Sequence, residues 1–72
     1  MRNQPRPTSI DTVKMANGQW ATSVSFEGGA TEAVSWDWSE ARAKAEEVGL
    51  TQVLDESEHL IWRLPPAAEP ED

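Results

Sequence analysis

The chain has 72 residues and no cysteine, and its 13 acidic and six basic residues give a formal net charge of −7. A domain this small buries only about 60% of the surface of its unfolded chain, and it has neither a disulfide framework nor a thiolate metal site to reinforce it. An acidic surface repels phosphate backbones, and no apolar run approaches the roughly 20 residues needed to cross a bilayer. We therefore expect a soluble, cytoplasmic protein that binds neither nucleic acid nor membrane directly.

Residues 1–7 are expected to form a flexible arm, because two prolines and the absence of apolar residues after Met1 leave nothing to repay the entropy of ordering. At the other end, residues 65–72 read PPAAEPED and predict a disordered acidic tail. Residues 8–64 carry all the strand and helix patterns, so we expect them to form the single domain. This body holds ten acidic and four basic residues.

The first element predicted in the domain is a β-hairpin. Two strand-like runs, SIDTVKMA and QWATSVSF, flank Asn17-Gly18, the pair that best accepts the positive φ angles of a two-residue type I′ turn. This turn places Met15 opposite Trp20, and it fixes which side chains share a face. The core face is expected to hold Val13, Met15, Trp20, Val24 and Phe26. The outward face is expected to hold Ile10, Thr12, Lys14, Ala21, Ser23 and Ser25.

A helix is predicted from Trp38 to Val48, after a connecting loop at residues 30–36. Asp37 is a good N-cap, Glu40 completes a capping box, and Trp36 before the cap packs on the first turn as a hydrophobic staple. Gly49 suits the left-handed residue that ends many helices. The stripe expected to face the sheet holds Trp38, Ala41, Ala45 and Val48.

Two short strands, LTQVL and HLIWRL, follow the helix and are separated by the polar segment at residues 55–58. The last strand is expected to turn Leu60, Trp62 and Leu64 to the core. These elements predict an α+β domain of order ββαββ, with one helix packed on a small antiparallel or mixed sheet.

The sequence shows no catalytic, cofactor or metal motif, and we expect a protein that is not an enzyme. His59 has no nucleophile or base near it in the sequence, and residues 55–58 lack the glycine and the ligand alternation of a calcium loop. Of the four tryptophans, Trp20, Trp38 and Trp62 are expected in the core. Trp36 stays partly exposed at its staple position, where it would anchor a partner.

A docking surface is predicted on the outward sheet face and at the helix entrance. Ile10 and Ile61 would form an apolar patch among basic side chains on an otherwise acidic surface. The expected partner-binding residues are Ile10, Lys14, Trp36, Ile61 and Arg63. We expect the protein to act as a monomer that binds a larger protein.

The small size, the acidity, the lack of cysteine and the ββαββ order resemble the small phage-encoded inhibitors of bacterial RNA polymerase that also act as antiterminators. That resemblance implies binding to a large polymerase subunit in the bacterial host cytoplasm, with altered initiation and termination of transcription. Two alternatives stay open. One is an acidic DNA mimic that inhibits a nuclease or repressor, and the other is a small structural or adaptor module.

Overall fold

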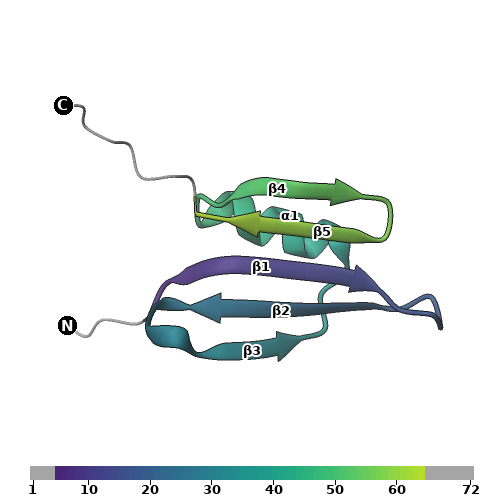
Figure 1. Ribbon diagram of the computed structural model, residues 1–72, viewed down its shortest axis with the longest axis horizontal. Helices are drawn as coiled ribbons and strands as arrows, with labels where there is room; N and C mark the ends of the chain where they lie inside the picture. The colour runs from purple at the N-terminus through teal and green to yellow at the C-terminus, as the bar shows by residue number, and fades with distance from the viewer. Residues whose placement is uncertain (1–4, 65–72) are drawn as a thin grey trace.

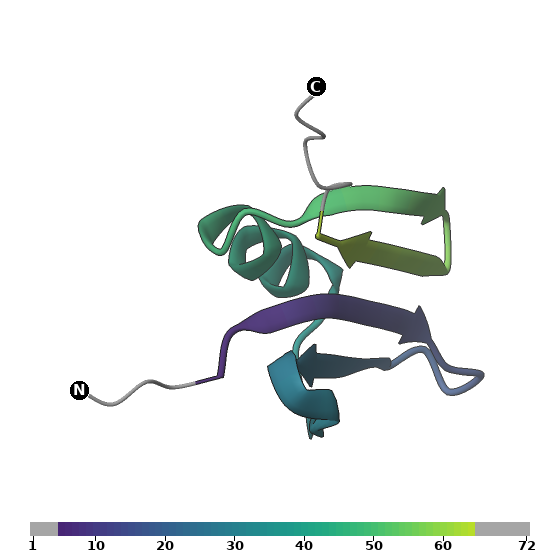
Figure 2. The same cartoon turned by 60° about the vertical axis from the view of Figure 1, so that its left-hand side comes forward.

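A computed structural model of the chain describes residues 5–64 and consists of one antiparallel sheet with one α-helix on one of its faces (Figures 1 and 2). The elements in chain order are β1 (Pro7–Lys14), β2 (Trp20–Phe26), the 3-10 turn η1 (Glu27–Gly29), β3 (Thr31–Val34), α1 (Trp38–Glu47), β4 (Thr51–Glu56) and β5 (His59–Arg63). The strand order in the sheet is β3-β2-β1-β5-β4. The predicted α+β class is confirmed, and the predicted tail at 65–72 lies outside the described residues.

The segment predicted to be a connecting loop contains strand β3, so the order is βββαββ rather than ββαββ. This strand pairs with β2, from Thr22 opposite Val34 to Ser25 opposite Thr31. The turn η1 reverses the chain between them, and Phe26 donates its backbone N–H to the carbonyl of Ala30. Backbone pairing at an edge needs little apolar burial, so a four-residue edge strand leaves a weak sequence signal.

The hairpin between β1 and β2 has a three-residue loop instead of the predicted two-residue turn. Met15 donates to the carbonyl of Gln19, and Gly18 donates to the carbonyl of Met15. Among the described residues only glycines take a positive φ, so Asn17 does not adopt the type I′ conformation. A type I turn followed by a left-handed glycine, Gly18 at φ 87°, closes the loop.

This loop shifts the register by one residue and turns β1 over. Lys14 pairs with Trp20, and Ile10 pairs with Val24. Ile10 is fully buried, whereas Val13 is 38% exposed and Met15 is 49% exposed. The prediction that Ile10 faces outward, with Val13 and Met15 in the core, is therefore wrong, because a slip of one residue exchanges the two faces of a strand.

The strand predictions for β2 and β5 are largely confirmed. Val24 on β2 and Leu60 and Trp62 on β5 lie in the core. Leu64 follows the end of β5 and is exposed, so its predicted core position is wrong. Strand β1 begins at Pro7, and the carbonyl of Arg6 accepts from Glu27 N–H, so the predicted flexible arm does not extend to residue 7.

Two threonines are buried in this otherwise apolar core. The hydroxyl oxygens of Thr12 and Thr22 are 2.6 Å apart, and Thr22 also donates to the backbone carbonyl of Trp36 at 2.9 Å. The Thr12 hydroxyl also lies 3.4 Å from the backbone carbonyl of Ala21, so each of the two hydroxyls has a carbonyl acceptor, and either can be the donor in the pair. The chain of bonds joins β1 and β2 to the segment that enters the helix.

The predicted N-cap at Asp37 is confirmed, and the helix ends at Glu47, one residue earlier than predicted, with Val48 as the C-cap residue. Among the hydrogen bonds of residues 5–64 the return bond of the predicted capping box, from the Glu40 side chain to Asp37, is not present. One carboxylate oxygen of Asp37 accepts from the N–H groups of Ser39 and Glu40, at 3.0 and 2.9 Å. The hydrogen bond from Glu40 N–H is the main reason that the pKa of Asp37 lies below its ordinary value. At the C-terminus, Gly49 donates to the carbonyl of Glu46 and Leu50 to that of Ala45, which is a Schellman ending.

Candidate functional site

The helix covers only part of the sheet face on which it lies. Its ten residues span about 15 Å, whereas the eight residues of β1 span about 26 Å. Ala41 and Ala45 are fully buried against the sheet, but Trp38 in the first turn is 45% exposed. The prediction that Trp38 is a core residue is therefore wrong.

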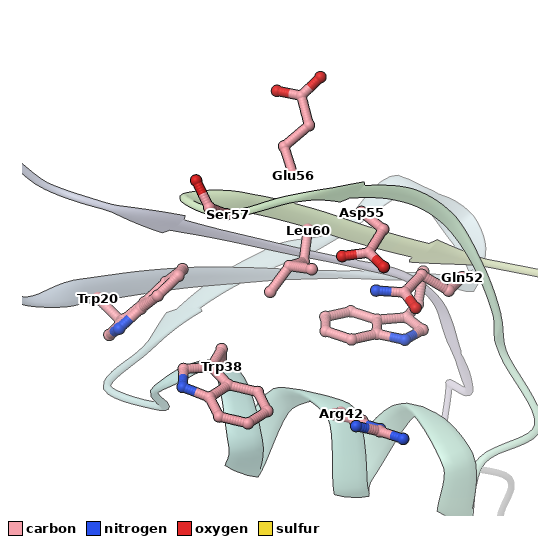
Figure 3. A pocket seen from close by; sticks show the side chains of 9 residues that line it. Trp20, Trp38, Arg42, Gln52, Asp55, Glu56, Ser57 and Leu60 are labelled. Atoms are coloured by element: carbon pink, nitrogen blue, oxygen red, sulfur yellow. The ribbon is translucent and has the colours of Figure 1, made fainter.

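The uncovered end of this face forms a hollow of about 240 Å³ that we call the tryptophan groove. Its apolar wall consists of Trp20 from β2, Trp38 from α1, and Leu60 and Trp62 from β5. Figure 3 shows Trp20, Trp38 and Leu60 around the same open space. Trp62 is 3% exposed and forms the floor, while Trp38 is the most accessible of these indoles.

The polar side of the groove consists of Arg42 from the helix, Gln52 and Asp55 from β4, and the turn at Glu56 and Ser57. The Asp55 carboxylate lies beside the amide of Gln52, whereas Glu56 points away from the open space (Figure 3). The guanidinium Nε of Arg42 lies 3.3 Å from a carboxylate oxygen of Glu46, so the charge of Arg42 is paired on the helix surface.

A β-bulge in β4 brings Gln52 and Asp55 to the same side of the sheet. Gln52 pairs with Trp62 and Asp55 pairs with Leu60, but Leu54 between them pairs with Ile61 on the other face. The extra residue is Val53, which is exposed at the sheet edge. In a regular strand two residues three positions apart point to opposite faces, so the bulge is what turns both polar side chains into the groove.

The structure separates the predicted partner-binding residues. Ile10 lies in the core opposite Trp62, so it cannot form a surface patch with Ile61. Ile61 and Arg63 lie on the open sheet face, opposite Asp11 and Ser9 of β1. Ile61 and Arg63 therefore lie on the expected face of the sheet, but Ile10 is not beside them on that surface.

The other two predicted contact residues lie near the groove or the helix entrance. Lys14 is on the helix side of the sheet, next to Trp20, because the register of β1 differs from the prediction. Trp36 is partly buried against the core, and its carbonyl accepts from Thr22. Trp38, two residues further on, is therefore the more accessible tryptophan.

Part of this site has no signal in the sequence. The alternation of β5 indicates that Leu60 and Trp62 share a face, and the N-cap indicates that Trp38 opens the helix. The bulge at Val53 and the difference in length between helix and strands are tertiary features, and they decide which tryptophans stay accessible and which polar side chains join them.

Elsewhere on the described residues the candidates are weaker. On the open face His59 Nε2 lies 3.0 Å from the carboxylate of Asp11, and both side chains are partly exposed. A broader hollow of about 640 Å³ at the other end of the sheet contains one aromatic ring, that of Phe26. Within residues 5–64 no group of three or more acidic, histidine or cysteine side chains is placed to hold a metal ion.

Comparison with protein families, with curated proteins and with solved structures finds no match to this chain. Over residues 5–64 there is also no helix with the length and apolar character needed to span a membrane.

Proposed function

We propose that this protein is a non-enzymatic binding module that docks a larger protein through the tryptophan groove. The observation that carries the proposal is the exposure of Trp38, at 45%, beside Trp20 and above the buried Trp62. Tryptophan is enriched among the residues that dominate protein interfaces, because its large ring buries much apolar area at a low cost in side-chain entropy. An indole left open beside two others is an anchor site for a partner side chain.

The open sheet face supports docking less well. Its central strands present small and polar side chains, such as Ala21, Ser23 and Ser25, and Ile61 is already half-buried between its neighbours. Neither of the two hollows described above is lined by these side chains, whereas interface hot spots lie in well-packed pockets. The groove is therefore the preferred docking surface.

We propose that the partner is a subunit of bacterial RNA polymerase in the bacterial cytoplasm, and that binding alters the initiation and termination of transcription.

The competing function is that of an acidic DNA mimic. It requires carboxylates spaced like phosphates, and the described residues place the carboxylates of Asp11, Asp37 and Asp55 on three different parts of the fold: the open face, the helix entrance and the groove. A partner that docks in an apolar groove should stay bound at moderate salt. A partner that binds by charge mimicry should be released, because salt screens the interaction between exposed charges.

The experiment compares three tagged versions of the full chain in capture from bacterial lysate at moderate salt. These are the wild type, Trp38→Ala in the groove, and Val13→Ala on the open face as a control that also shortens an exposed apolar side chain. We expect Trp38→Ala to lower the captured amount about tenfold or more, as the loss of a hot-spot residue does, and Val13→Ala to leave it unchanged.

Circular dichroism and thermal unfolding establish that both variants are folded before the capture is compared. Equal capture by the wild type and Trp38→Ala would exclude the groove as the docking site. Transcription in vitro with purified polymerase then tests the partner: unchanged initiation and termination at saturating wild-type protein would remove polymerase as the partner.

A further inference from the structure

We propose that the partner group bound in the tryptophan groove is a basic side chain, a lysine or arginine carried on a segment of the partner protein. This inference rests on the proposed function, since it names the chemistry of the ligand at the same site. It is carried by three observations: the aromatic lining, the position of the Asp55 carboxylate and the size of the hollow.

The aromatic lining is suited to a cation. A lysine ammonium or an arginine guanidinium is attracted to the face of an aromatic ring, and tryptophan is the best of the rings for this contact. Trp38 on the helix is accessible, and Trp20 on β2 lies near it at the same end of the hollow (Figure 3). The aliphatic stem of the same side chain would cover Leu60 and the edge of Trp62, while its charged end remains near water.

The charges around the groove favour the same ligand. The Asp55 carboxylate lines the hollow on the helix side of the sheet, because the bulge at Val53 turns it there. The one base in the lining, Arg42, lies within ion-pair distance of Glu46 and therefore adds little net positive charge. With a formal net charge of −7, the whole chain also attracts cationic segments during encounter.

The size of the groove limits what it holds. About 240 Å³ is below the roughly 300–1,000 Å³ of pockets that enclose drug-sized ligands or cofactors. A single extended side chain fits better than a cofactor, and the open mouth leaves room for the main chain that carries it.

Lys14 is a base beside this site that does not line it. It lies across from Trp20 on the same face of the sheet, at the end of β1. Its positive charge opposes a cationic ligand, so its removal strengthens binding if the ligand is basic and weakens binding if the ligand is acidic. Lys14→Gln therefore reports the sign of the ligand charge independently of Asp55.

The test uses the full chain labelled with ¹⁵N and three blocked pentapeptides, Gly-Gly-X-Gly-Gly, in which X is lysine, norleucine or glutamate. The indole N–H signals, assigned by single Trp→Phe variants, are followed during titration. The lysine peptide is expected to shift the signals of Trp20 and Trp38, with the norleucine peptide about fivefold to tenfold weaker because it lacks the charge. The glutamate peptide is expected to leave the signals unchanged.

Two matched variants separate a local carboxylate contact from the general field of an acidic protein. Asp55→Asn removes one charge at the groove, and Glu32→Gln removes one charge on β3 at the opposite edge of the sheet. We expect Asp55→Asn to weaken the lysine peptide about fivefold to tenfold, Glu32→Gln to change it less than about twofold, and Lys14→Gln to strengthen it.

Four results would overturn the inference: equal binding of the norleucine peptide, equal weakening by Asp55→Asn and Glu32→Gln, weaker binding of the lysine peptide by Lys14→Gln, or no shift with the lysine peptide. Each of these leaves the proposed function standing if Trp38→Ala still abolishes capture of the partner. If capture does not depend on Trp38, the proposed function fails whatever the peptides show.

Discussion

The two faces of the sheet differ in chemistry although the same strands form both. The helix side holds Ile10, Val24 and Trp62 under two fully buried alanines of the helix. The open side holds mainly small, polar and charged side chains, including the contact between His59 and Asp11, together with the apolar Val13, Leu54 and Ile61. The tryptophan groove lies on the same face as the core, at the point where the helix stops covering the sheet.

This difference shows that the part of the sheet covered by the helix, rather than the hydrophobic pattern of the sequence, decides which apolar residues are accessible. Trp62 and Trp38 both lie on the helix side, yet Trp62 is 3% exposed and Trp38 is 45% exposed. The helix is too short to cover the strands, and its central contacts are alanines, which hold it close to the sheet. Its first turn consequently ends beside an open hollow.

The largest effect expected from a substitution is at the floor of the groove. Trp62→Ala removes a buried indole and should lower the free energy of unfolding by about 3–5 kcal/mol, a large part of the stability of a domain this small. Ile61→Ala, its neighbour on the open face, should cost about 1 kcal/mol or less. Urea unfolding followed by circular dichroism measures both, and similar costs would contradict the assignment of the two faces.

The buried threonines provide a second, smaller contrast. Thr22→Val leaves the Trp36 carbonyl without its donor and removes the hydroxyl that pairs with Thr12, so it should cost about 1–3 kcal/mol. Thr12→Val should cost less, because Thr22 keeps its bond to Trp36. The double variant should cost less than the sum of the two, since the hydroxyls share one network.

The control for this contrast is Ser23→Ala on the open face. It should stay within about 0.5 kcal/mol of the wild type, as exposed substitutions usually do. Additive costs for the two threonines in urea unfolding would show that their hydroxyls are not coupled.

A small effect with a defined pH dependence is expected at the helix entrance. The pKa of Asp37 in the folded state lies below its ordinary value of 3.8, mainly because Glu40 N–H donates to the carboxylate. Its contribution to stability is therefore fully present above pH 3.8 and is lost as the pH falls through the lower folded-state value. Wild type should be more stable than Asp37→Ala at pH 7, and the difference should shrink in acid.

Thermal unfolding of both proteins between neutral and acidic pH measures this dependence. Asp37→Asn is the control, because asparagine also caps helices but does not titrate. A difference between wild type and Asp37→Ala that stays constant down to the lowest pH would show that the charge of Asp37 does not contribute.

Local sequence signals correctly predicted the helix, whereas an ambiguous turn sequence led to the wrong face being predicted for strand β1. Asp37 and Gly49 mark the helix ends because capping depends on a few adjacent residues. Asn17-Gly18 fits both a two-residue turn and a type I turn with a following glycine, and these differ by one residue of register. That single residue moved Ile10 from the predicted docking surface into the core.

The candidate site was less predictable than the fold. The sequence indicates the shared face of Leu60 and Trp62, but the placement of Asp55 depends on a bulge that pairing with β5 defines. The exposure of Trp38 depends on the helix being shorter than the strands on which it packs, and other parts of the chain form those strands. Such tertiary features decide which residues line the groove.

The most direct test of the account is to locate the captured partner on the surface of the protein. Unlabelled partner is added to the ¹⁵N-labelled full chain, and the loss of signal is followed at the indole N–H groups of Trp20 and Trp38 and at the amides of Ser23 and Ile61. If the partner occupies the tryptophan groove, the two indole signals broaden first while both amide signals persist. Early broadening at Ser23 and Ile61, with unchanged Trp38, would place the partner on the open face and contradict docking in the groove.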